Sequence, residues 1–386
     1  MKSYGTRYNF SPLVFHLKGT PQYFTLFYLK FNMKNRFSLL FSLFLLIKTA
    51  SSQTTYNDPT FPFFDFKQPT SKAEWLKRRT SIRKTAWELL GKLPEIPTKV
   101  DVKTLNREQK NGYVLEKFSF FNGVDGTVIG YLLIPDSVKN NAKAVLYHHY
   151  HGGDYLQGKN ELFKKNWVNT EGVGEGLVRE GYVVMCIDAY GFGERQLTSP
   201  DSVKGSNEEL TWAKINLWKG RSLFGMVVRD DKMALNYLVS RPEVDKNRIA
   251  AVGMSFGCLR SLWLAALDER IKTTVAVACI TRNQSLIKAG RLRAHGIYYY
   301  IPNILNYFDN ESVWACIAPR SLLTLSGDED QNAPFDGVQY INQSIKSVYT
   351  VLAKTEQFKS VIYKGVKHEY TPTMWQETLH FLKEKL

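Results

Sequence analysis

The chain has 386 residues, of which 44% are hydrophobic and 23% are charged. This composition is typical of a globular protein with a substantial core and excludes a disordered or collagen-like chain. The formal net charge is +15, but residues 1–52 hold seven basic and no acidic side chains, which leaves +8 on residues 53–386. The longest basic run in that remainder is Lys77–Arg79, so we expect no nucleic-acid partner.

The N-terminal residues have the pattern of a secretory signal. Lys34 and Arg36 are basic, Phe37–Ile47 form a mostly apolar run of 11 residues, and Ala50–Ser52 supply small residues for cleavage. The apolar run is too short to span a bilayer stably. We therefore expect an upstream extension over 1–32, an export signal that starts near Met33, and no membrane span after cleavage. An N-terminal membrane anchor is the alternative.

Beyond this leader, a short polar segment precedes a long domain. Residues 53–110 contain scattered prolines and are expected to be helical or irregular, with one helix over 71–90. The long domain, 111–386, opens with two strand-like runs, 112–121 and 126–135, which are separated by an Asn-Gly turn signal. These two runs predict an antiparallel entry hairpin.

The remaining chain alternates between apolar strand-like runs and helical patterns. The expected strands are 142–149, 182–189, 248–254, 271–280, 320–327 and 357–363, and the expected helices are 173–181, 230–241, 256–267 and 374–384. This order predicts an α/β fold with a mostly parallel central sheet and helices on both faces. Two segments, about 191–228 and 281–320, are too long for simple connections and are expected to be lid-like insertions that carry function.

A serine stands on a tight corner between an expected strand and an expected helix. The sequence GMSFG at residues 253–257 fits the pattern G-x-S-x-G, which in this context predicts an exposed nucleophile, Ser255. The backbone N–H of Phe256 and the start of the helix would face an oxygen that gains negative charge. The alternative is an incidental glycine-rich turn.

An activated serine needs a base, and the base needs an acid that orients it. His368 follows the last expected strand and precedes the final helix, which is where a base at the sheet edge would lie. The acid should fall between serine and histidine in the chain. In the stretch GDEDQNAP we expect Asp330 to be this acid, and Asp328 is the alternative.

A glycine pair after the strand at 142–149 predicts the rest of the oxyanion site. We expect the N–H of Tyr150 to be the second donor beside that of Phe256. A metal site is the competing interpretation, because four groups that could bind a metal lie together here: His148, His149, His151 and Asp154. A metal would leave the serine corner unexplained, so we expect neither a metal nor a cofactor.

Together these stretches resemble the α/β-hydrolase superfamily, and most of all its dienelactone hydrolase-like and acetyl xylan esterase-like branch, which is related to the prolyl oligopeptidases. The resemblance covers about residues 110–386 and includes LYHHYHGG, CIDAYGFGER, RIAAVGMSFG, IAPRSLLTLSGDED and KHEYTP. It implies catalytic roles for Ser255, Asp330 and His368. It departs at His149, where glycine is common in such esterases.

Aromatic residues in the two insertions suggest a substrate pocket. Such rings can stack on sugars or close over an apolar pocket. We expect substrate contacts from four residues: His149, His295, Trp218 and Tyr299. Packing within the lid is the alternative for most of the aromatic residues.

These observations predict an exported serine hydrolase that cleaves carboxylic esters, with a small-molecule or acetyl xylan-like carbohydrate ester as substrate. A serine peptidase of the prolyl oligopeptidase type is the alternative among enzymes, although only about 60 residues are available for a preceding propeller. A binding module on an inactive hydrolase scaffold is the alternative outside enzymes. The oligomeric state is left open.

Overall fold

The computed structural model describes residues 12–15, 24–27, 65–165, 168–169 and 171–386. The chain divides into two units, residues 1–54 and 55–386. In the first unit β1 (Pro12–Phe15) and β2 (Phe24–Phe27) pair antiparallel. The expected export signal, residues 33–52, lies outside the described residues. Among the described helices, none combines the length and apolar character needed to cross a bilayer.

A nine-stranded sheet in the order β11-β10-β9-β8-β6-β7-β5-β4-β3 forms the centre of the second unit. From β7 to β11 all neighbouring strands run parallel, whereas β5, β4 and β3 continue the sheet with antiparallel pairs. The predicted α/β fold with a mostly parallel sheet is therefore confirmed. The strands are β3 (Val102–Lys110), β4 (Tyr113–Phe121), β5 (Thr127–Pro135), β6 (Ala142–His148), β7 (Val183–Ile187), β8 (Val244–Met254), β9 (Ile271–Val277), β10 (Ser321–Gly327) and β11 (Phe358–Tyr363).

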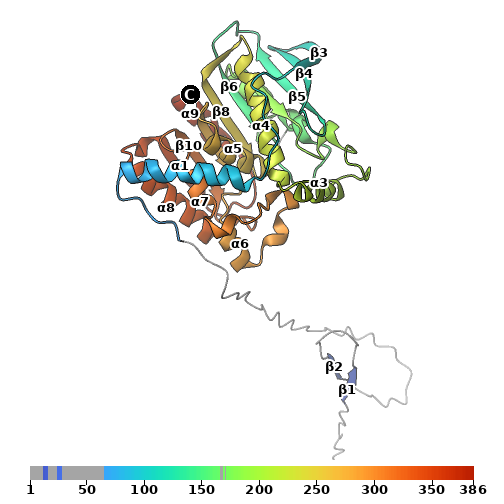
Figure 1. Ribbon diagram of the computed structural model, residues 1–386, viewed down its shortest axis with the longest axis vertical. Helices are drawn as coiled ribbons and strands as arrows, with labels where there is room; N and C mark the ends of the chain where they lie inside the picture. Colours follow the sequence, from blue (N-terminus) through green and yellow to red (C-terminus); the bar gives the residue numbers. More distant parts are fainter. Residues whose placement is uncertain (1–11, 16–23, 28–64, 166–167, 170) are drawn as a thin grey trace, which may run out of the picture. The chain divides into compact units, whose positions relative to one another are not determined.

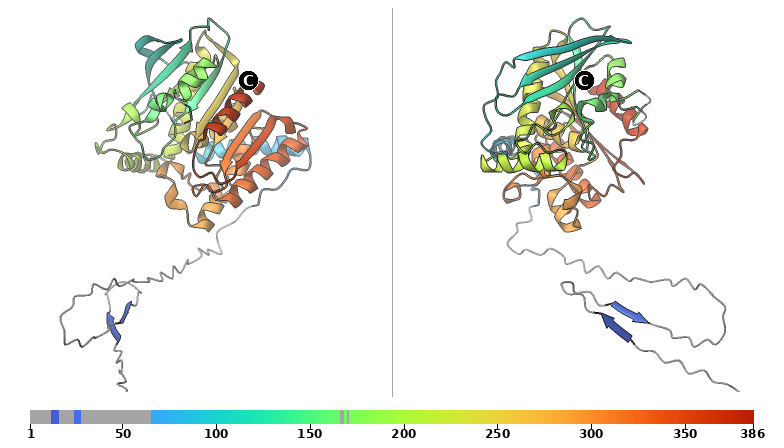
Figure 2. Two further views of the ribbon diagram at one scale, coloured as in Figure 1. Left: turned by 180° about the vertical axis from the view of Figure 1, so that it is seen from behind. Right: turned by 90° about the vertical axis from the view of Figure 1, so that its right-hand side faces the viewer.

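Helices cover both faces of this sheet. In Figure 1, α4 and α5 lie in front of the strands, and the view from behind in Figure 2 shows the C-terminal helix α9 on the other face. The helices are α1 (Lys72–Leu89), α2 (Val173–Arg179), α3 (Ser206–Trp218), α4 (Leu223–Ser240), α5 (Phe256–Leu267), α6 (Asn283–Ala289), α7 (Asn310–Ala315), α8 (Phe335–Val351) and α9 (Pro372–Lys385). Short 3₁₀ turns are η1 (Gly158–Phe163), η2 (Gly193–Arg195), η3 (Leu292–Ala294), η4 (Ile297–Tyr299), η5 (Ile304–Asn306) and η6 (Thr355–Gln357).

The strands divide the core into two layers because successive side chains point to opposite faces. On β6, Ala144 and Leu146 join the layer formed with α1, α4, α5 and α8. Val145 and Tyr147 join the other layer, with α2 and α9. All four side chains are buried, which explains why this strand reads as a continuous apolar run.

Two parts of the fold differ from the expectation. Val102–Lys110 form the edge strand β3, although residues 53–110 were expected to be helical or irregular. Nearly all of β3 is exposed, and its sequence does not alternate between apolar and polar residues, which is why no strand was predicted there. Its pairing with β4 holds it in the sheet. Helix α4 begins at Leu223 instead of 230, because Ser222 caps it by accepting the N–H of Gly225 at 2.9 Å. The first insertion therefore ends earlier than predicted.

Candidate active site

Three side chains predicted to act together meet at the carboxyl edge of the parallel strands. Ser255 follows β8, Asp330 lies in the loop after β10, and His368 lies in the loop after β11. The Nε2 atom of His368 is 2.8 Å from the Oγ atom of Ser255, and its Nδ1 atom is 2.8 Å from Oδ2 of Asp330. An imidazole that donates from Nδ1 to the carboxylate keeps its Nε2 lone pair for the serine proton. The three groups form one hydrogen-bonded chain.

The corner at Ser255 depends on the two glycines beside it. Ser255 has φ +57° and ψ −113°, a conformation that residues with a side chain rarely adopt. A Cβ atom at Gly257 would lie 1.9 Å from the carbonyl oxygen of His148, and one at Gly253 would lie 2.5 Å from the carbonyl oxygen of Gly257. Glycine at both positions therefore lets the end of β6 approach the start of α5 and hold the serine in place.

The loop after β10 presents Asp330, and not Asp328, to the histidine. Asp330 is 4% exposed, and its Oδ1 atom accepts the backbone N–H of Asn332 at 2.8 Å. Its other oxygen is the partner of His368. Asp328 instead accepts the backbone N–H of Gly365 at 2.6 Å, so it braces the two loops that carry the acid and the base.

The oxyanion site differs from the prediction. Helix α5 begins at Phe256, so the N–H of this residue has no acceptor within the helix. The N–H of Tyr150, predicted as the second donor, donates to Oε2 of Glu161 at 2.7 Å. Glu161 is fully buried and also accepts the hydroxyl of Tyr147 at 2.5 Å. Burial raises the pKa of the Glu161 carboxyl to about 8. The prediction for Tyr150 is wrong for this structure, because the buried carboxyl group of Glu161 already accepts its N–H.

His149, predicted to contact substrate, is buried beneath the corner. Its Nε2 atom accepts the backbone N–H of Ala189 at 3.1 Å, so its Nδ1 atom carries the proton and donates to the carbonyl oxygen of Tyr150 at 2.8 Å. Burial lowers the pKa of His149 well below its usual value, which favours this neutral form. The ring packs against Phe192 and Phe256. Substrate contact is excluded in this arrangement because backbone groups occupy both ring nitrogens.

A buried ion pair supports the start of α5. Arg260 donates to both carboxylate oxygens of Asp231, at 2.6 and 3.0 Å, and all of these atoms are shielded from solvent. The guanidinium also lies 5.3 Å from the ring centroid of Phe256. His148 lies beside this pair, and burial lowers its pKa to about 3. These contacts fix the first turn of α5, and with it the position of Ser255.

A cavity of about 600 Å³ opens at Ser255 and His368, and we call it the active-site cavity. Its remaining walls come from the loop after β6, from α3, from the second insertion and from the loop after β10. They are formed by His151, Gly152, Gly153, Tyr155, Ser206, Asn207, Glu209, Leu210, Arg293, Ala294, His295, Gly296, Ile297, Tyr298 and Asn332. Both predicted insertions therefore contribute to the cavity.

Two histidines in this cavity have fixed partners. The Nε2 atom of His151 is 3.0 Å from Oε1 of Glu209, and the same carboxylate accepts the hydroxyl of Tyr155 at 2.9 Å. The Nε2 atom of His295 donates to the carbonyl oxygen of Asn332 at 2.9 Å, and burial lowers the pKa of His295 to about 4. Sequence patterns gave no signal for Glu209 or Asn332, because neither follows a recognisable motif.

Two further predicted substrate contacts lie outside this cavity. Trp218, the last residue of α3, is 90% exposed to solvent. Tyr299 is 6% exposed, lines a separate cavity, and has its hydroxyl 3.4 Å from Nδ2 of Asn310. Of the four residues predicted to contact substrate, His295 is the one that lines the active-site cavity.

Three of the four polar groups considered for a metal, the histidines, have other partners. His148, His149 and His151 pair with Ser261, with backbone groups and with Glu209, respectively. Within the described ranges, no group of three or more His, Cys, Asp or Glu side chains is arranged to hold a metal ion.

Comparison of the chain with known proteins identifies its family. The model of the Abhydrolase family matches residues 48–370. The chain belongs to the Abhydrolase family. A curated relative, "Putative hydrolase YtaP" of Bacillus subtilis (strain 168), is 32% identical over 309 residues, which are 80% of this chain and 100% of the relative.

Solved structures share the fold of this Abhydrolase family member. A "putative acetyl xylan esterase" from Bacteroides fragilis NCTC 9343 is 21% identical with a TM-score of 0.63, and the match covers 79% of each chain. A glucuronoyl esterase from Solibacter usitatus is 17% identical with a TM-score of 0.63, and the match covers 85% of this chain and 100% of the other. The predicted resemblance to the α/β-hydrolase superfamily is confirmed.

Proposed function

We propose that this Abhydrolase family member is a serine hydrolase that cleaves carboxylic esters through an acyl-enzyme. One observation carries the proposal. Ser255, His368 and Asp330 are joined by hydrogen bonds, and Ser255 lines a cavity of about 600 Å³. A serine hydroxyl is a weak nucleophile unless a positioned base removes its proton, and this chain supplies that base.

In the proposed mechanism, Oγ of Ser255 attacks the ester carbonyl while Nε2 of His368 takes its proton. Asp330 accepts from Nδ1 and stabilises the imidazolium. The N–H of Phe256 and the positive end of α5 stabilise the oxyanion. His368 then protonates the leaving alcohol, and a water activated by the same imidazole releases the acid and restores Ser255.

The proposed substrate is an ester carried by a carbohydrate. Two structural neighbours are described as a "putative acetyl xylan esterase" and a glucuronoyl esterase, which supports this class. The active-site cavity also combines aromatic and neutral polar groups, among them Tyr155, Asn207 and Tyr298, a lining suited to sugar rings and their hydroxyls. The proposed site of action is outside the cytoplasm, on the basis of the signal-like pattern at residues 33–52.

Substitution of the serine tests the proposal. Ser255→Ala should lower kcat/KM on p-nitrophenyl acetate by about 10³-fold or more. Ser347→Ala, a serine on α8 whose hydroxyl donates to the backbone of its own helix, is the matched control and should keep the wild-type rate. A fluorophosphonate probe should also label Ser255 in the wild-type protein. Unchanged hydrolysis in Ser255→Ala would contradict the proposal.

A further inference from the structure

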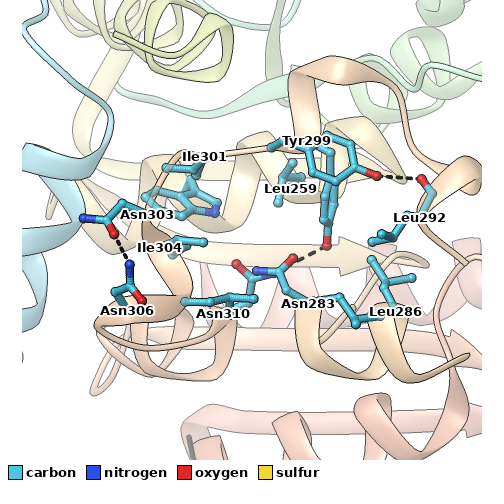
Figure 3. Close-up of a pocket in the computed structure, with 14 residues that line it drawn as sticks. Leu259, Asn283, Leu286, Leu292, Tyr299, Ile301, Asn303, Ile304, Asn306 and Asn310 are labelled. Atoms are coloured by element: carbon cyan, nitrogen blue, oxygen red, sulfur yellow. Dashed lines mark hydrogen bonds between the residues drawn. The ribbon is translucent and has the colours of Figure 1, made fainter. Parts of the chain in front are cut away.

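A second cavity lies within the second insertion, apart from the active-site cavity. It has a volume of about 320 Å³, and we call it the lid cavity. Leu259 and Trp263 of α5 form one wall. The other walls come from α6, from the segment that follows it and from Asn310 at the start of α7; Figure 3 shows Leu259 and Asn310 among the lining residues. Neither Ser255 nor His368 lines it, so the proposed esterase mechanism gives it no role.

No Asp, Glu, Lys, Arg or His side chain lines the lid cavity. Its walls are leucine, isoleucine, tryptophan and tyrosine side chains together with four asparagines: Asn283, Asn303, Asn306 and Asn310. A charged ligand would find no opposite charge here and would lose its hydration, so the occupant must be neutral. Part of this amide capacity is used inside the protein: Asn306 donates to the side-chain oxygen of Asn303, and Asn310 donates to the carbonyl oxygen of Thr281 and to the Tyr299 hydroxyl. The remaining amide donors and acceptors fit a ligand with several hydroxyls, because an amide can both donate and accept.

One buried donor at this cavity has no partner. Trp263 is fully buried, and its indole N–H makes no hydrogen bond with any described residue. Buried donors are normally paired, and this donor belongs to a ring that lines the lid cavity. The buried indoles of Trp75, Trp212 and Trp314 also have an unpartnered N–H, but they do not line it. The nearby tyrosine hydroxyls are already used: Tyr300 donates to the carbonyl oxygen of Leu292 at 2.6 Å, and the Tyr299 hydroxyl is the partner of Asn310.

The wall between the two cavities is a single short segment. Leu292 and Tyr299 line the lid cavity, whereas Arg293, His295 and Tyr298 line the active-site cavity. The rings of His295 and Tyr299 lie 4.2 Å apart, centroid to centroid, so they pack on each other from opposite sides of the wall. A ligand in the lid cavity would therefore rest against the ring that supports His295.

We propose that the lid cavity binds a single neutral pyranose ring. The C–H face of such a ring is apolar and can pack on the aromatic and aliphatic walls, while its hydroxyls pair with the asparagine amides and with the indole N–H of Trp263. The cavity is large enough for one small ligand and lies at the low end of the size range of small-molecule sites. Binding at this site does not require the esterase reaction.

The test uses the full chain and sugars that carry no ester. Titration calorimetry and saturation-transfer NMR with methyl β-xylopyranoside and methyl β-glucopyranoside should show saturable binding, in the wild type and in Ser255→Ala alike. Trp263→Phe keeps an aromatic ring and removes the N–H, and it should weaken binding by about fivefold or more. Trp75→Phe is the matched control, because Trp75 is equally buried, also has an unpartnered N–H and does not line the cavity. It should leave the affinity unchanged.

Asn306→Ala tests the same site without disturbing the core, because Asn306 is exposed at the cavity. It should weaken sugar binding while leaving the melting temperature near that of the wild type. The proposal is overturned if neither sugar binds at tens of millimolar, or if Trp263→Phe and Asn306→Ala bind as the wild type does. Binding of n-butanol without binding of either sugar would also overturn it, since the cavity would then be a purely apolar site. Because the probes contain no ester, the failure of this proposal leaves the proposed hydrolase function untouched.

Discussion

The backbone carbonyl oxygen of His148 lies 1.9 Å from the position that a Cβ atom would take at Gly257. Gly257→Ala must therefore push the end of β6 away from the start of α5, and the corner at Ser255 moves with them. We expect a loss of about 1–3 kcal/mol or more in the free energy of unfolding, together with a large fall in esterase activity. Chemical denaturation and p-nitrophenyl acetate hydrolysis measure the two effects. Gly126→Ala, which meets nothing within 4 Å, is the control and should change neither.

The choice between two aspartates in one loop gives a second prediction. Asp330→Asn removes the carboxylate that accepts from Nδ1 of His368. The neutral imidazole then loses the group that orients it, and the imidazolium formed during the reaction loses the negative charge that stabilises it. By analogy with serine proteases, kcat should fall about 10³- to 10⁴-fold. Asp328→Asn keeps an oxygen that can accept the N–H of Gly365 and should retain most of the activity. Equal losses in both variants would contradict the assignment of Asp330.

The buried carboxyl of Glu161 predicts a pH dependence of stability. Burial raises its pKa from 4.5 to about 8, so between these values the unfolded chain releases a proton that the folded protein keeps. The contribution of Glu161 to stability is therefore complete below pH 4.5 and is lost as the pH rises toward 8. Over this window Glu161→Gln, which cannot titrate, should lose less stability than the wild type, by a difference on the order of a few kcal/mol. Urea denaturation at several pH values measures the difference. Parallel curves for both proteins would contradict this prediction.

Local patterns in the sequence were enough to predict the geometry of the triad. The spacing of Gly253, Ser255 and Gly257 predicts a tight strand-to-helix turn. Such a turn depends on neighbouring residues in the chain, so the sequence alone can predict it. Asp330 and His368 each follow an apolar strand, and parallel strands bring their carboxyl ends to one edge of the sheet. Chain order and strand position therefore predicted contacts between residues more than 100 positions apart.

Other parts depended on tertiary contacts that no local pattern encodes. Strand β3 is almost wholly exposed, and its pairing with β4 gives it its structure. The N–H of Tyr150 is taken by Glu161, whose burial follows from the packing of η1 under the sheet. Helix α8 is a different case: Val338, Ile341, Ile345 and Val348 have helical spacing and are all buried, so a closer count of apolar periodicity could have predicted it.

The exposed face of α3 gives the last prediction, which concerns polymeric substrates. Asn207 and Leu210 line the active-site cavity, and Lys214, Leu217 and Trp218 continue the same helical face outward. All five are exposed, Trp218 to 90%. The row extends about 12 Å from Leu210 to Trp218 at the rise of an α-helix, so a sugar chain whose ester lies at the serine could stack on the indole.

Trp218→Ala should therefore lower kcat/KM on acetylated xylan about threefold to tenfold, the range expected for one lost aromatic stacking contact. The same variant should hydrolyse p-nitrophenyl acetate at the wild-type rate, because Trp218 lies outside the cavity that a small ester enters. Phe121→Ala, which removes a 61% exposed ring at the end of β4, is the matched control and should leave both substrates unaffected. A loss of equal size on the polymer and on the small ester would show that Trp218 acts through the stability of α3 and not through contact with a sugar chain.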